Sequence, residues 1–185
     1  MEKLSLPFRV LGAEVWLPER AEEKAPMAPM PRALPRRMGR LSRAVLSCVS
    51  RLADKLGAEV LQYPVVYASR YGEIARTLKL FEELAEYGEV SPAGFSVSVH
   101  NAAASLLGLA SENCNSSSTL AAGADTLRMG VLEAVMNART QPCLFVYGDE
   151  QQMEQECVQA VAAVIVADEQ PRSLPQTIEE LLQLC

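Results

Sequence analysis

Residues 91–123 read SPAGFSVSVHNAAASLLGLASENCNSSSTLAAG, and this stretch carries most of the information about the fold. It predicts two helical segments joined by a polar turn of Cys, Asn and Ser. Residues 101–110 are nearly all small or apolar, which predicts a helix that is buried on all sides. His100 is the single histidine of the chain, and its neighbour Asn101 is suited to cap this helix.

Outside this stretch, strand and helix signals alternate along the chain. Apolar, β-rich runs predict strands over 8–17, 63–69, 141–148 and 159–167. Helical spacing predicts helices over 41–56, 74–88 and about 116–136, and a short last helix over 177–184 that begins with a Thr177–Glu180 capping box. The connection 149–158 is too short for an easy parallel crossover, so the last two strands should be antiparallel. The order predicts an α/β fold with a mixed sheet.

One of these helices has a clear apolar stripe. Ile74, Leu78, Phe81 and Ala85 recur at helical spacing and form its expected inner face.

Residues 18–39, between the first predicted strand and the first predicted helix, contain five prolines. This predicts an irregular surface arm within a single domain over 1–185.

Composition excludes several classes of function. The net charge of −6 argues against a general nucleic-acid binder. Five cysteines at irregular spacing and one histidine make a structural zinc site improbable, and no metal site is expected. No apolar run has the length of a signal peptide or a membrane span, so a cytoplasmic protein is expected.

The polar turn allows two interpretations of Cys114. A thiol on a turn before a helix is activated by the helix dipole, with His100 as the one available base. A packed turn cysteine is the simpler interpretation, because the spacing does not support a Cys–His pair. The SSST run over 116–119 lacks the glycines and lysine of a phosphate-binding loop, which favours helix capping. Asp149 and Glu150 are adjacent and should point in different directions, so they are a doubtful acid–base pair.

Several motifs together resemble a known family. They are SPAGFSVSVHNAAASLLGLA, VWLP near residue 15, PRRMGRLSRAVL, VVYASRYGEIARTLKLFEEL, and STLAAGADTLRMGVLEA before LFVYGDE. Over roughly residues 10–150 the chain resembles the N-terminal half of β-ketoacyl synthases, and in particular the chain-length factors of aryl polyene and related type II polyketide biosynthesis. The resemblance implies one thiolase-like half, with layered helices around a mixed five-stranded sheet. Chain-length factors are inactive partners of a working ketosynthase.

The resemblance also implies a degenerate active site. Ketosynthases present a cysteine at the start of a buried helix in the pattern CSSSL. Matching that pattern places Asn115 or Ser116 at the nucleophile position, and only a further shift recruits Cys114. The remaining catalytic groups of the family come from its C-terminal half, and His100 matches neither family histidine.

The implied function is that of a non-catalytic subunit without a cofactor. It would form a heterodimer with a full-length β-ketoacyl synthase and meet the acyl carrier protein transiently. The expected tunnel and interface residues are Phe95, His100, Asn101, Ala103, Gly108 and Met129, and the expected carrier-docking residues are Arg36, Arg37 and Arg40. Two alternatives remain open at this point: an acyltransferase or thioesterase-like enzyme that uses Cys114, and a scaffold of the biosynthetic complex.

Overall fold

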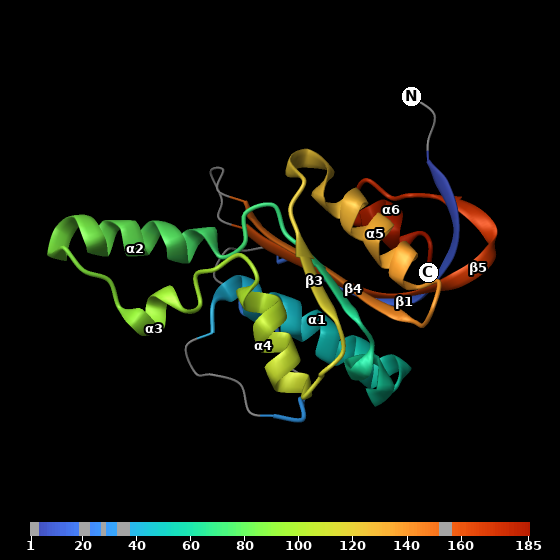
Figure 1. Ribbon diagram of the computed structural model, residues 1–185, viewed down its shortest axis with the longest axis horizontal. Helices are drawn as coiled ribbons and strands as arrows, with labels where there is room; N and C mark the ends of the chain where they lie inside the picture. Colours follow the sequence, from blue (N-terminus) through green and yellow to red (C-terminus); the bar gives the residue numbers. More distant parts are fainter. Residues whose placement is uncertain (1–3, 19–22, 27–28, 33–37, 152–156) are drawn as a thin grey trace.

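The computed structural model describes residues 4–18, 23–26, 29–32, 38–151 and 157–185. Its centre is one mixed sheet in the order β1-β5-β4-β2-β3 (Figure 1). The strands are β1 (Ser5–Trp16), β2 (Val65–Ala68), β3 (Ser117–Leu120), β4 (Cys143–Gln151) and β5 (Cys157–Ser173). Strand β2 runs parallel to β3 and β4, whereas β5 is antiparallel to β4 and β1. The expected α/β fold with a mixed five-stranded sheet is therefore confirmed.

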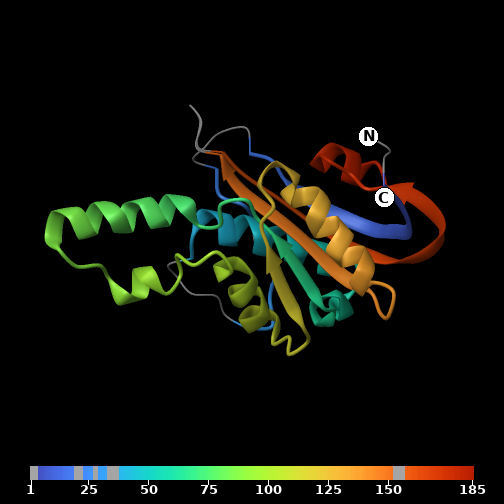
Figure 2. The same cartoon turned by 45° about the horizontal axis from the view of Figure 1, so that its top comes forward.

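Helices cover both faces of this sheet. The helices of the described residues are α1 (Arg40–Leu56), α2 (Ile74–Tyr87), α3 (Pro92–Phe95), α4 (Ala102–Ser111), α5 (Thr126–Asn137) and α6 (Ile178–Leu182), with 3₁₀ helices η1 (Ala58–Gln62) and η2 (Gly123–Asp125). Helices α1 and α4 pack on one face, and α5 and α6 pack on the other (Figure 2). Successive side chains of β4 point to opposite faces of the sheet and so contribute to both hydrophobic cores. Leu144 and Val146 face α1, whereas Phe145 and Tyr147 face α5.

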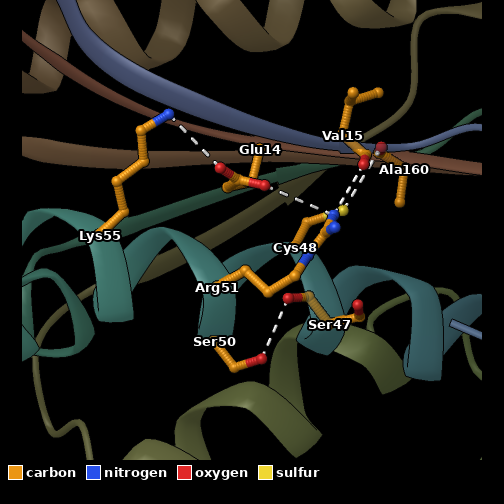
Figure 3. A network of polar contacts seen from close by, with 8 residues as sticks. All are labelled: Glu14, Val15, Ser47, Cys48, Ser50, Arg51, Lys55 and Ala160. Carbon is orange, nitrogen blue, oxygen red and sulfur yellow. Dashed lines mark hydrogen bonds and ion pairs between the residues drawn. The ribbon is translucent and has the colours of Figure 1, made fainter. Parts of the chain in front are cut away.

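Polar contacts fix α1 against the outer strands (Figure 3). The Arg51 guanidinium donates to the Val15 carbonyl at 2.7 Å and lies 3.6 Å from the Glu14 carboxylate. The Cys48 thiol donates to the Ala160 carbonyl at 3.5 Å, and burial raises the pKa of Cys48 to about 12. Cys48 is therefore a protonated, structural thiol in the interior of the domain.

The helix predicted over about 116–136 is wrong over residues 116–125. Residues Ser117–Leu120 form the edge strand β3, and the helix begins only at Thr126. In β3 the backbone N–H and C=O groups of this segment form hydrogen bonds with β2. A helix would have to replace these hydrogen bonds. Because Ser116 to Thr119 precede or form a strand, they do not cap a helix.

The predicted inner face of α2 is also wrong. Helix α2 projects away from the layers together with α3, as both views show (Figures 1 and 2). Leu78 is 43% exposed and Phe81 is 63% exposed, and Leu80 is the single buried residue of the helix. The helical period was correct, but the apolar stripe faces solvent in this chain. The helix predicted over 101–110 is likewise not buried on all sides, since Leu109 of α4 is exposed, and Phe95 before it is exposed as well.

Two expected helix caps have different outcomes. The Thr177 hydroxyl accepts from the Glu180 amide at 3.2 Å, which confirms the cap of α6. Asn101 does precede α4, but its side chain makes no capping bond. The described residues between 18 and 39 are neither helix nor strand. No helix in the described ranges is long and apolar enough to cross a bilayer.

Candidate functional site

The carboxyl ends of the three parallel strands β2, β3 and β4 lie at one edge of the sheet. Open α/β sheets bind their ligands at this edge. A cavity of about 280 Å³ lies there, lined by the segment after β2, the turn before α5, the end of β4 and the segment before α6. This cavity is the candidate site, and three groups of residues shape it.

The first group is the turn between β3 and α5, with the sequence Ala121-Ala122-Gly123-Ala124-Asp125. Gly123 has a φ of +58°, which lets the chain reverse direction into the helix. Thr126 follows, and its hydroxyl donates to the Gly123 carbonyl at 2.7 Å and accepts from the Ala122 amide at 2.9 Å. Thr126 lines the cavity but is only 2% exposed, and both hydrogen bonds of its hydroxyl lie within the turn.

The second group surrounds Asp149 at the end of β4. The Asp149 carboxylate accepts from the Tyr71 amide at 3.2 Å, the Ser69 hydroxyl at 3.3 Å and the Tyr147 hydroxyl at 3.2 Å. Burial raises the pKa of Asp149, and the hydrogen bonds from these donors act against that shift. Burial also raises the pKa of Tyr147, so its hydroxyl stays protonated and donates. Asp149 therefore holds the loop after β2 in place.

Two further buried carboxylates lie beside this group. Glu150 accepts from the Ala75 amide at 3.1 Å, and Glu73 accepts from both the amide and the hydroxyl of Ser42. A Cβ on Gly39 would collide with the Glu73 carboxylate, so the glycine makes room for it. Both carboxylates bind amides in the first turns of helices, where backbone N–H groups lack partners. Sequence reasoning missed Glu73, because its partner Ser42 is distant in the chain.

The third group contains His100. Its Nε2 lies 2.7 Å from the Ser69 carbonyl, and a Cβ on Gly72 would come within 2.9 Å of the His100 Cα. The segment that leaves the sheet after β2 and the segment that returns from α3 therefore meet at His100. The neighbouring Asn101 is exposed.

The predicted nucleophile region lies at the opposite edge. Cys114, Asn115 and Ser116 are exposed and precede β3, at the amino ends of the parallel strands. Four residues of strand span about 13 Å. The Asn115 side chain donates to the Gln62 carbonyl at 2.7 Å, which fixes the turn to η1. The structure therefore does not bring Cys114 and His100 together, and Cys114 precedes a strand rather than a helix.

The other expected tunnel and interface residues occupy different environments. Phe95 is 60% exposed on α3, whereas Gly108 on α4 and Met129 on α5 are half-buried. Ala103 has no exposed surface and packs in the core beneath the sheet with α1. Substituting Ala103 would therefore disturb the domain's own core.

Of the expected carrier-docking residues, Arg40 alone lies in the described ranges, and Arg36 and Arg37 fall outside them. Arg40 is exposed at the start of α1. It borders a cavity of about 270 Å³ together with Arg76 and Lys79 of α2, and the buried carboxylates Glu73 and Glu150 line the same cavity. These cations come from two elements and lie on one surface.

Comparison with known proteins agrees with this architecture. The family model of the β-ketoacyl synthase N-terminal domain matches residues 13–175. One chain of the structure of a ketosynthase (ApeO) in complex with its chain length factor (ApeC), from Xenorhabdus doucetiae, has the same fold, with a TM-score of 0.70 and 21% sequence identity over 88% of this chain and 79% of that chain. Among curated proteins there is no match. The family match covers most of the sequence, and the chain therefore belongs to the family of β-ketoacyl synthase N-terminal domains.

Proposed function

We propose that this chain is a non-catalytic, chain-length-factor-like subunit. It pairs with a full-length β-ketoacyl synthase and shapes that partner's acyl tunnel in aryl polyene, polyketide or fatty-acid-like biosynthesis. The observation that carries this proposal is the turn between β3 and α5, which contains alanine, glycine and aspartate. The similar solved structure, a ketosynthase in complex with its chain length factor, adds support from the fold.

The turn matters because ketosynthases present their cysteine at the start of a buried helix. In this chain α5 is the helix that follows the turn lining the cavity. We therefore assign the degenerate nucleophile position to Ala121–Gly123, in place of Asn115 or Ser116. Neither a methyl group nor a hydrogen can form an acyl intermediate, and the Thr126 hydroxyl is engaged within the turn.

The alternative of an enzyme that uses Cys114 gains no support from the geometry. An activated thiol needs a base or a helix dipole within reach. Cys114 precedes a strand, and His100 binds a carbonyl at the other edge of the sheet. The proposal therefore gives Cys114 no chemical role.

Met129 is the best-placed candidate for a side chain that limits product length. It lies on α5, the helix that follows the degenerate turn, and is half-buried. Met129→Ala removes bulk without unfolding the core, so products of the reconstituted heterodimer should lengthen. Met136→Ala on the same helix is the matched control, because Met136 is 45% exposed and belongs to the last turn of the helix.

Reconstitution tests the proposed function. Co-expression with a full-length β-ketoacyl synthase of the same organism should give a stable heterodimer by size-exclusion chromatography. Mass spectrometry of the products should show longer chains for Met129→Ala and unchanged chains for Met136→Ala. A chain that stays monomeric beside every ketosynthase tested would refute the pairing, and identical product lengths for all forms would remove Met129 from the tunnel.

Carrier docking is a second part of the proposal. Arg40, Arg76 and Lys79 form a basic surface that suits an acidic carrier protein. The double charge reversal Arg40→Glu with Lys79→Glu should lower carrier-dependent turnover and leave heterodimer formation intact. Unchanged turnover at low salt would contradict this role.

A further inference from the structure

Exposed apolar surface concentrates on residues 74–99, which comprise α2, α3 and the return to α4; we name this segment the projection. Of the twelve large apolar side chains that are exposed in the described ranges, six belong to the projection. They are Leu78, Phe81, Leu84, Tyr87, Phe95 and Val99. An apolar patch of this density on one element marks a surface that binds another molecule.

The projection lacks the contacts that normally stabilise an amphipathic helix. Helices gain most of their stability by burying an apolar stripe, yet Leu78 and Phe81 face solvent. Helix α2 packs mainly against the four-residue α3. A cavity of about 540 Å³ remains between them. Its apolar lining is Leu80, Ala93, Gly94 and Val97, and its polar lining is Arg76, Lys79, Glu83 and Ser91. Both sides of α2 therefore offer apolar surface to a partner.

The base of the projection is fixed even though its surface is open. Glu150 binds the Ala75 amide, and Glu73 binds Ser42 at the start of α1. His100 binds the Ser69 carbonyl where the chain returns. A docking element that is already ordered loses little conformational entropy when it binds.

Charge selects the class of partner. Within the projection, Arg76 and Lys79 lie in the first two turns of α2, and from Leu80 to Asn101 the sequence contains four glutamates and no lysine or arginine. Three of these, Glu82, Glu86 and Glu89, are exposed. An acidic border repels nucleic acid, anionic membranes and acidic carrier proteins. It suits an apolar groove that is bordered by lysine and arginine.

We propose that the projection inserts into an apolar, basic-bordered groove on the ketosynthase partner, with Leu78 and Phe81 as the central contacts. This inference rests on the proposed function and names the surface through which the pairing occurs. The basic cluster of Arg40, Arg76 and Lys79 lies at the base of the projection.

The apolar contact is tested by affinity. Full-length β-ketoacyl synthases of the same organism are titrated with the wild type and with the double variant Leu78→Ser/Phe81→Ser. Loss of two central apolar contacts should weaken binding on the order of 30-fold. Leu11→Ser is the matched control, because Leu11 is 44% exposed on β1 at the far edge of the sheet, and it should bind as the wild type does. Circular dichroism should show the same helix content for all three proteins.

The acidic border is tested by rate. Glu82→Lys/Glu86→Lys should slow association about tenfold at low ionic strength and reduce its dependence on salt. An unchanged association rate would refute the charge complementarity.

The outcomes distinguish a failure of the proposed pairing from a failure of the projection as its contact surface. If no ketosynthase binds the wild type, the proposed function and this inference both fall. If the wild type binds and the Leu78/Phe81 variant binds equally well, only the inference falls. A wild-type homodimer that this variant abolishes would assign the surface to a second copy of the chain and overturn the ketosynthase as occupant. Binding of the wild type to anionic vesicles or to acyl carrier protein, lost in the same variant, would overturn it too.

Discussion

Burial sets Cys48 and Cys143 apart chemically from Cys114. Cys48 and Cys143 donate to backbone carbonyls in the two cores, and burial raises the pKa of each to about 12. Cys114 is exposed on the turn before β3. The reactivity of a thiol follows its exposure and its thiolate fraction, so these positions should differ sharply.

Alkylation measures this difference. At pH 8, iodoacetamide should modify Cys114 in the folded protein and leave Cys48 and Cys143 unmodified until denaturant is added. Peptide mass spectrometry identifies the modified positions, with Cys114→Ser as the control for assignment. Rapid modification of Cys48 or Cys143 in the folded protein would contradict their burial.

The raised pKa of Asp149 predicts a particular pH dependence of stability. Burial raises the pKa of the Asp149 carboxyl in the folded state above its value in the unfolded chain, so the folded protein binds this proton more tightly. The stabilisation from this more tightly bound proton is therefore fully present below the unfolded-state pKa and is lost as the pH rises through the folded-state pKa. Asp149→Asn removes this titration. Urea unfolding between pH 3.5 and about 7 should show the wild type losing stability relative to the variant, and parallel profiles would contradict the shift.

At the residue scale, the sequence indicated several notable side chains but predicted the hydrogen-bond partners of only a few of them. The cap by Thr177 was predictable because its partner Glu180 is three residues away. The contact between Glu73 and Ser42 was not, because it joins two helix starts that only the folded chain brings together. His100 was recognised as notable, but its partner, the Ser69 carbonyl, follows a strand that lies earlier in the chain.

At the scale of elements, packing between helix and sheet is closest under α5. A Cβ on Gly130 would lie 2.6 Å from the Ala68 Cβ and 2.7 Å from the Phe145 ring. Overpacking of this kind costs about 1–3 kcal/mol, because neither neighbour can move without disturbing the sheet.

A pair of glycine substitutions tests this packing. Gly130→Ala should lower the free energy of unfolding by about 1–3 kcal/mol. Gly108→Ala on α4 is the matched control, because its Cβ would meet nothing closer than 3.8 Å and alanine favours helix by about 1 kcal/mol. Urea unfolding should therefore show opposite signs for the two changes. Equal destabilisation would contradict the close approach of α5.

The elements themselves were largely predictable, with two instructive exceptions. Ser117–Leu120 has too little local signal to be identified as a strand, and its conformation follows from the free edge of β2. The stripe of α2 has the helical period, but periodicity does not show whether the surface that covers it belongs to the same chain. Both exceptions arise from contacts beyond the local sequence.

At the scale of the whole molecule, the site and the projection lead to one account. The carboxyl edge of the sheet has the architecture of a ketosynthase half, while the turn before α5 lacks a nucleophile. The projection offers apolar surface that this chain does not cover. We therefore expect the chain to supply shape to a heterodimer and its partner to supply the chemistry.

Intact mass spectrometry of the acylated heterodimer tests this division of labour most directly. The complex with a full-length β-ketoacyl synthase is incubated with an acyl carrier substrate, and the mass of each chain is recorded. The account predicts an acyl adduct on the ketosynthase and none on this chain. An adduct on this chain that disappears in Cys114→Ala would contradict it and assign the chemistry to the exposed thiol.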